Sequence, residues 1–160
     1  GLQHNTVEQV VGADDIERAI ALVREMPVAS HVTQFAIGLA RYSRPNDDAS
    51  DFVREHVAWG GGPRSSQFLV LGAKAHALLH GRLSVDYDDV VAVAHSVLRH
   101  RIRLNYSATA SQITPDEVID HIIQQLNSSG SAEIDNHSTL TREQRDQSSK
   151  VFRSEDASSS

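Results

Sequence analysis

The chain of 160 residues is long enough for one modest domain with a tail. It contains no cysteine, which excludes disulfides, thiol catalysis and cysteine-bound zinc and leads us to expect a cytoplasmic protein. Its 15 basic and 21 acidic residues give a formal charge of -6, without the basic excess of a dedicated nucleic-acid-binding protein. No apolar run reaches the roughly 18 to 20 residues that span a bilayer, so we expect no membrane segment.

The N-terminal part of the chain predicts a linker followed by two helices. Residues 1–12 carry neither a starting methionine nor a charged stretch before an apolar run, and we expect them to be a linker. Residues 13–26 repeat apolar residues at helical spacing. The expected inward face of this helix is Ile16, Ala19, Ile20 and Val23. Residues 30–42 predict a second helix, with Ser30 as its N-cap. Its apolar stripe is Val32, Phe35, Leu39 and Tyr42.

The middle of the chain predicts a short helix and a long one. After the turn-rich connector SRPNDDAS, a third helix is expected from Ser50 to about residue 58. Pro63 suits the first position of a fourth helix, where its missing N–H does no harm, and Gly81 ends that helix. Its expected buried face is Phe68, Leu71, Ala75 and Leu78.

The last two expected helices begin at capping signals. Asp86 followed by Asp89 resembles a capping box, and predicts a helix that runs to about residue 101. Its inward residues are Val90, Val93, Ala94 and Val97. Thr114 and Pro115 begin the final helix, which is expected to end at residue 126.

The remaining residues lack the apolar content of a core. From residue 127 the chain is rich in serine, and we expect a disordered tail over 127–160 with a weak helix around 141–152. Strand signals are poor, because short β-prone runs lie inside helical periodicity and no hairpin turn separates alternating segments. The predicted fold is therefore all-α: a small bundle of five or six helices over 13–126 with a disordered C-terminal tail.

Two clusters of basic and imidazole side chains are candidates for chemistry. His76 and His80 stand four apart on one helix, which is the spacing of zinc hydrolases, but the position of the catalytic glutamate is Ala77 and no third ligand is indicated. We therefore predict no metal site. Arg99, Arg101 and Arg103 lie at a helix C-terminus, where carbonyl groups favour cations, so we expect a C-terminal cation cluster or a subunit contact. A phosphate or nucleic-acid contact is the alternative, although the cluster has no interleaved aromatic residues on which bases could stack.

The segment WGGGPRSSQF, residues 59–68, is the third candidate. Consecutive glycines allow a sharp turn and a close backbone approach, and a helix N-terminus offers free N–H groups to an anion. Arg64 adds a bidentate donor, and Gly61, Gly62 and Pro63 would present it to a phosphate. Because Arg64 lies four residues before Phe68, we expect it on the inward-facing side of the helix. A plain loop with a surface arginine is the competing interpretation.

Several catalytic signatures are missing from the chain. The sequence contains no G-x-x-x-x-G-K-[ST] phosphate loop, no apolar strand ending in magnesium-binding acids and no serine nucleophile elbow. We therefore expect no hydrolytic activity from these 160 residues alone.

Three separated segments together resemble one protein family. REMPVASHV (24–32), WGGGPRSSQFLVLGAKAHALLHGR (59–82) and YDDVVAVAHSVLRHRIRLNYSA (87–108) occur in the order and spacing of the C-terminal helical lid of MoxR-type AAA+ ATPases. The resemblance covers about residues 7–126. It departs from the family pattern at Ser65 and Ser66, because a small apolar residue is expected directly after the arginine.

The resemblance implies a function and partners for this lid. In such lids the arginine of the helix start is the second sensor, which reaches the γ-phosphate of ATP, and Arg64 occupies that position. ATP and its Mg²⁺ would be bound mainly by an AAA+ core domain of the same chain. The family forms rings, usually hexamers, that remodel or mature other protein complexes, often with von Willebrand A-domain partners.

Two functions of other classes remain open from the residues. A free-standing helical interaction or nucleic-acid-binding module would use the basic cluster at 99–103. A metal-dependent hydrolase would need zinc at His76 and His80.

Overall fold

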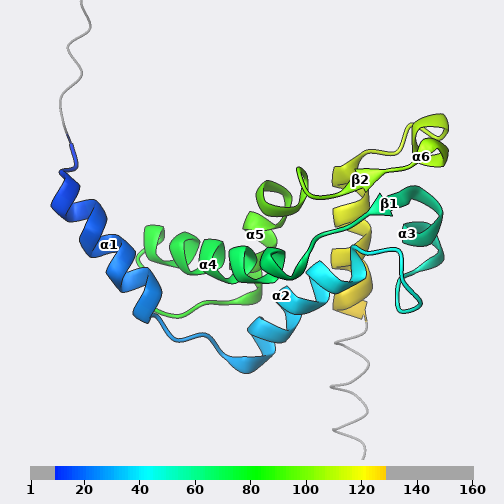
Figure 1. Ribbon diagram of the computed structural model, residues 1–160. Helices are drawn as coiled ribbons and strands as arrows, with labels where there is room; N and C mark the ends of the chain where they lie inside the picture. The colour runs from blue at the N-terminus through cyan, green and yellow to red at the C-terminus, as the bar shows by residue number, and fades with distance from the viewer. Residues whose placement is uncertain (1–9, 129–160) are drawn as a thin grey trace, which may run out of the picture. The chain divides into compact units, whose positions relative to one another are not determined.

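The computed structural model describes residues 10–128 and shows a mainly helical chain (Figure 1). The labelled helices are, in chain order, α1 (Ala13–Glu25), α2 (Ser30–Tyr42), α3 (Asp51–His56), α4 (Pro63–Leu79), α5 (Tyr87–Leu98) and α6 (Tyr106–Ala110). A further helix spans residues 115–128. The predicted all-α class is confirmed, and α6 is a short helix that the sequence pattern does not predict.

The predicted segment boundaries are only partly covered by the structure. Most of the linker expected over 1–12 and nearly all of the tail expected over 127–160 lie outside the described residues. The boundaries of the 13–126 domain therefore stay a prediction. Among residues 10–128, no helix combines the length and the apolarity that crossing a membrane requires.

A two-stranded antiparallel sheet joins distant parts of the chain. Strand β1 (Val57–Trp59) pairs with β2 (Arg103–Leu104), in a register that places Val57 opposite Leu104 and Trp59 opposite Arg103. The sequence predicts a helix through residue 58, whereas α3 already ends at His56. Strands of two and three residues are too short to show an alternating pattern, so this contact is visible only in the fold.

Helices α4 and α5 form the centre of the larger of two compact units, to which residues 10–120 belong. The buried face of α4 is Ser65, Leu69, Ala73 and Ala77. This corrects the predicted face, since Phe68 and Leu71 are each 45% exposed. Gly72 explains the shift, because a Cβ there would lie 3.3 Å from the Val93 side chain and α5 can approach α4 closely at this point.

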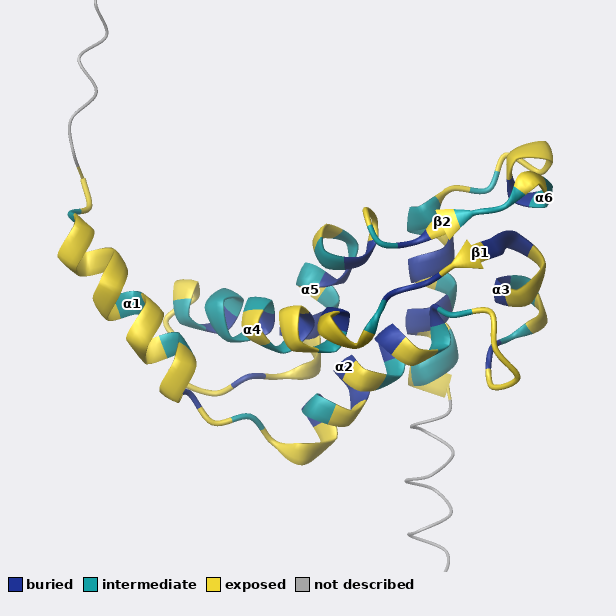
Figure 2. Ribbon diagram, viewed as in Figure 1, coloured by how far each residue is buried: buried dark blue, intermediate teal, exposed yellow. Residues whose placement is uncertain are grey.

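The predicted inward face of α1 is also corrected. None of its residues is buried, and most of the helix is exposed in Figure 2. Ile16 and Ile20 are 53% and 47% exposed, while Ala19 and Val23 are half-buried. The helix lies against α4, where the Lys74 ammonium donates a hydrogen bond to the Arg24 carbonyl at 3.3 Å. Helix α1 thus contacts α4 along only one narrow side of its surface.

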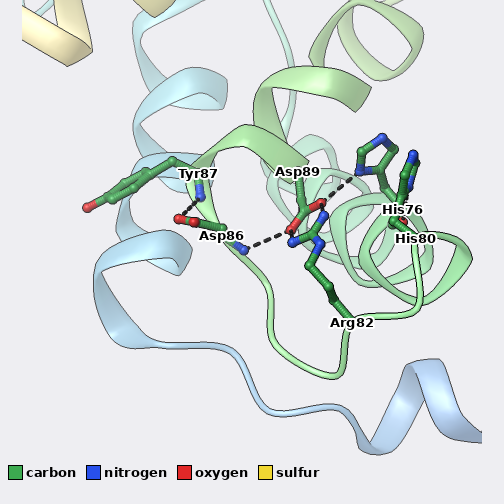
Figure 3. Close-up of polar contacts among 6 residues, drawn as sticks. All are labelled: His76, His80, Arg82, Asp86, Tyr87 and Asp89. Atoms are coloured by element: carbon green, nitrogen blue, oxygen red, sulfur yellow. Dashed lines mark hydrogen bonds and ion pairs between the residues drawn. The ribbon is translucent and has the colours of Figure 1, made fainter.

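The predicted capping box is confirmed and belongs to a larger polar cluster around Asp89 (Figure 3). The Asp89 side chain is fully buried at the start of α5. Its Oδ2 accepts hydrogen bonds from the Asp86 N–H at 2.9 Å and from Arg82 Nη1 at 2.8 Å. Its Oδ1 accepts from Arg82 Nη2 and lies 2.7 Å from Nδ1 of His76 on α4. One carboxylate therefore joins the end of α4, the connecting loop and the start of α5.

The environment of Asp89 favours its charged form. The hydrogen bonds from Arg82 lower the pKa of Asp89 well below its usual range, although burial alone would raise it. A carboxylate with a depressed pKa in the folded state stabilises the fold above its unfolded pKa of about 3.9, and this contribution is lost as the pH falls below that value.

We predict that Asp89→Asn lowers the free energy of unfolding at neutral pH by about 2 to 3 kcal/mol, because the amide cannot accept from all three neighbours. Urea unfolding across the pH range measures this. The difference in the free energy of unfolding between the variant and the wild type should shrink below about pH 4, because the stabilising contribution of the charged Asp89 carboxylate is lost there. Asp88→Asn, at an exposed neighbouring residue, is the matched control, and an equal loss there would contradict the prediction.

Candidate functional site

The glycine segment before α4 packs tightly on the end of α2. A Cβ at Gly60 would lie 2.0 Å from the Ser43 carbonyl oxygen, so only glycine fits there. A Cβ at Gly61 would lie 2.9 Å from Oγ of Ser65 and 3.2 Å from Oγ of Ser43. At Gly62, in contrast, no atom lies within 4 Å of an added Cβ and φ is -72°. Two of the three glycines therefore pack closely against other parts of the chain, while the predicted approach to a phosphate stays a prediction.

Two side chains from the end of α2 hold this segment. The buried Ser43 hydroxyl accepts a hydrogen bond from the Gly61 N–H at 2.8 Å and donates to the Ala40 carbonyl at 2.9 Å. Nε of Arg44 donates to the Gly61 carbonyl at 2.6 Å. Because both backbone groups of Gly61 are bound, the glycine segment is a fixed connection between α2 and α4.

Arg64 lies exposed in the first turn of α4, directly after Pro63. Its guanidinium makes no hydrogen bond or ion pair with any residue in the described range 10–128. The expectation that Arg64 faces inward with Phe68 is wrong, since both face solvent. Within residues 10–128 the Arg64 guanidinium is therefore unpaired, and it lies at the start of a helix, where the helix dipole favours an anion such as phosphate.

A pocket of about 410 Å³ adjoins the glycine segment. Gly61, Gly62 and Pro63, which are three of the four residues expected to approach a phosphate, line this pocket, and Arg64 does not. The pocket is also lined by Trp59 and Gly60 of the same segment, and by three residues that sequence reasoning missed, Arg44, Pro45 and Ala58. Arg44 and Pro45 belong to the connector SRPNDDAS, whose sequence predicts only a turn. The local sequence therefore could not indicate that they lie beside the glycine segment.

The histidine pair has a structural explanation. His76 bonds to Asp89 as described, and Nδ1 of His80 lies 2.8 Å from the His76 carbonyl oxygen. The two rings are 4.2 Å apart. Among the described residues, no group of three or more His, Asp or Glu side chains could hold a metal ion.

The basic cluster at 99–103 is divided among different contacts. Nε and Nη2 of Arg99 donate to the Asp116 carboxylate at 2.7 Å and 2.8 Å. Arg101 donates to the Val97 carbonyl and stacks its guanidinium 4.9 Å from the centre of the Phe68 ring. Arg103 lies on β2, opposite Trp59. The three arginines therefore do not form one surface for a nucleic-acid backbone.

Comparison with known proteins assigns the fold to a domain type. Residues 50–122 match the AAA lid domain. The chain is 30% identical to Chaperone MoxR1 of Mycobacterium tuberculosis over 125 residues, which is 78% of this chain and 33% of that protein. It also resembles the crystal structure of a Cytophaga hutchinsonii protein assigned as an ATPase, with a TM-score of 0.70 and 25% identity. That match covers 76% of this chain and 38% of the other.

We predict that Gly60→Ala prevents stable folding, or lowers the free energy of unfolding by more than about 3 kcal/mol, because its Cβ meets backbone that cannot move independently. Gly62→Ala is the control, and we expect a change of less than about 1 kcal/mol. Thermal unfolding monitored by circular dichroism distinguishes the two. Equal tolerance at both positions would contradict the close packing of Gly60.

We predict that removing the hydroxyl group changes the free energy of unfolding in opposite directions at two buried serines, Ser65 and Ser43. Ser65 is buried on α4, and its hydroxyl has no partner among the described residues, so Ser65→Ala should raise the free energy of unfolding by about 1 kcal/mol. Ser43→Ala removes the acceptor of the Gly61 N–H, so it should lower the free energy of unfolding by about 1 to 2 kcal/mol. Urea titrations of both variants test this, and changes of the same sign would contradict it.

Proposed function

The chain belongs to the MoxR-type AAA+ ATPases, whose lid domain it carries, and we propose that this lid senses bound ATP through Arg64 and couples hydrolysis to chaperone-like remodelling of protein complexes. The observation that carries the proposal is the guanidinium of Arg64 at the start of α4, which has no partner among residues 10–128. Arg44, Arg82 and Arg101, in contrast, each bind a neighbouring group with the guanidinium.

The backbone that carries Arg64 is held in place, and this supports the sensor role. Transition-state charge on a transferring phosphoryl group is stabilised best by donors that are already in place when the charge develops. Ser43 and Arg44 fix the backbone three residues before Arg64, so the start of α4 is held before any nucleotide arrives. Loss of the γ-phosphate would remove the partner of Arg64 and change the preferred angle of the lid.

The remaining parts of the proposed function concern the whole ATPase, because the chain spans about a third of its curated relative. We expect an AAA+ core domain in the same polypeptide to bind ATP and Mg²⁺, with Gly61, Gly62, Pro63 and Arg64 approaching the nucleotide from the lid. We further propose a ring, with six subunits as the expected number, in the cytoplasm. A von Willebrand A-domain protein is the proposed type of cooperating partner.

The test of the sensor role is Arg64→Ala in the intact ATPase. We expect turnover to fall by about 10-fold to 1000-fold while the lid keeps its thermal stability, because the lost side chain contacts only nucleotide. Steady-state ATP hydrolysis and circular dichroism measure the two effects. Gln67→Ala, one turn along α4 and also exposed, should leave turnover unchanged. Undiminished hydrolysis by Arg64→Ala would remove the sensor assignment.

A further inference from the structure

The imidazole rings of His76 and His80 each use one nitrogen within the fold and leave the other free for a ligand. His76 lies in the last turn of α4 and His80 directly after it, and their ring centres are 4.2 Å apart. Nδ1 of His76 bonds to the Asp89 carboxylate at 2.7 Å, and Nδ1 of His80 bonds to the His76 carbonyl at 2.8 Å. Because a carboxylate and a carbonyl can only accept, each Nδ1 is the donor, and Nε2 of each neutral ring keeps its lone pair.

The geometry of the two rings suits one shared ion. Figure 3 shows the rings side by side, with their second nitrogens pointing to the same side, away from Asp89 and Arg82. The His76 side chain is 30% exposed and His80 is exposed, so an ion can reach both rings from solvent. An ion that binds two imidazoles at about 2.0 to 2.1 Å and at a right angle would place the ring centres about 4.5 Å apart, which is close to the observed 4.2 Å.

The hydrogen bonds at Nδ1 are those that support metal ligands. Histidines that bind a metal ion almost always donate their other ring N–H to a carboxylate or a backbone carbonyl, because this bond orients the ring and makes the free nitrogen more basic. His76 has the first kind of acceptor and His80 has the second. Both rings are thus oriented before an ion arrives, which lowers the entropy cost of binding it.

The charges around the pair also favour a cation. The carboxylates of Asp86, Asp88 and Asp89 all act on the Arg82 guanidinium, so three acids surround one base in this cluster. The last carbonyl groups of α4 add negative partial charge at the same end of the helix.

We propose that His76 and His80 bind one divalent transition-metal ion through their two Nε2 atoms. Among residues 10–128 no third carboxylate or imidazole completes a metal-binding group, so water fills the other coordination positions. Two imidazoles at a right angle, with water oxygens, suit Cu²⁺ best and then Ni²⁺ or Zn²⁺, whereas Mg²⁺ prefers oxygen ligands alone. The site differs from a hydrolase centre, because it needs neither a catalytic glutamate nor a third protein ligand.

A bound ion holds the corner between α4 and α5. With its Nε2 bound to the ion, the His76 ring stays in place as a donor to Asp89, which is the residue that joins the two helices. Metal binding therefore stabilises the folded chain. His76 follows Arg64 by twelve residues, or about 18 Å along the helix, so the metal site is independent of the sensor role.

Calorimetric titration of the 160-residue chain with Cu²⁺ tests the site. His80→Gln should weaken binding of the ion by about 100-fold, because the remaining imidazole loses the advantage of a second tethered ligand. The exposed position of His80 lets this variant fold, which circular dichroism verifies. His100→Gln is the matched control and should bind Cu²⁺ as the wild type does, since His100 is exposed and has no histidine three or four residues away.

Spectroscopy and thermal unfolding give sharper tests of the two-imidazole site. The electron paramagnetic resonance spectrum of bound Cu²⁺ should show coupling to two imidazole nitrogens in the wild type and to one in His80→Gln. Ni²⁺ and Zn²⁺ should displace Cu²⁺ when added in excess, whereas the same excess of Mg²⁺ should not. Ni²⁺ should raise the unfolding temperature of the wild type and leave that of His80→Gln unchanged.

The proposal is wrong if His80→Gln binds Cu²⁺ as tightly as the wild type, because the ion then lies elsewhere in the chain. It is also wrong if the wild-type spectrum shows coupling to a single imidazole nitrogen. An equal loss of affinity in His100→Gln would likewise contradict it, since the effect would then follow from any exposed histidine. None of these results bears on Arg64 or on nucleotide.

Discussion

The buried carboxylate of Asp89 is the constraint on which the arrangement of α4 and α5 depends. A fully buried charge is tolerated only when its oxygens are bonded, and here the bonds come from Arg82, His76 and the Asp86 N–H. These donors belong to three successive segments of the chain. Satisfying one side chain therefore fixes the angle at which α5 returns along α4, and the small residues Gly72 and Ala73 then allow the two helices to approach closely.

A second constraint acts at the opposite end of α4. The end of α2 provides the Ser43 hydroxyl and the Arg44 guanidinium, and both bind Gly61. Helix α4 is thus held at its start by α2 and near its end by α5. A helix held at both ends, with a guanidinium in its first turn that has no partner among residues 10–128, is suited to pass a displacement at Arg64 on to α2 and α5. Under the proposed function, flexibility is needed between the lid and the nucleotide-binding domain, and the glycine segment itself stays fixed.

The sequence predicts the long helices and their ends well, because capping residues and helical periodicity are local properties. The Asp86–Asp89 box, Pro63 at the start of α4 and Gly81 with a φ of 71° after its end are all observed. The buried face of α4 could not be predicted, because the segment FLVLGAKAHALL is apolar on nearly every side and periodicity selects no face. The short β1–β2 pairing and the Arg44 contact depend on residues distant in the chain, so local patterns contain no sign of them.

In the segment GGGPR, the glycines and the arginine are explained by different causes, although in the sequence they look like a single motif. Gly60 and Gly61 are required by packing, because backbone and hydroxyl atoms of Ser43 occupy the space that a side chain would need. Arg64 is required by nothing within the described part of the lid, since no residue there contacts its guanidinium. The described part of the fold does not need the Arg64 side chain, yet it holds the backbone before Arg64 in place. Under the proposed function, Arg64 therefore has a partner outside the lid. That partner is an anion, since a guanidinium at a helix N-terminus favours negative charge, and under the same proposal it is the phosphate of a nucleotide.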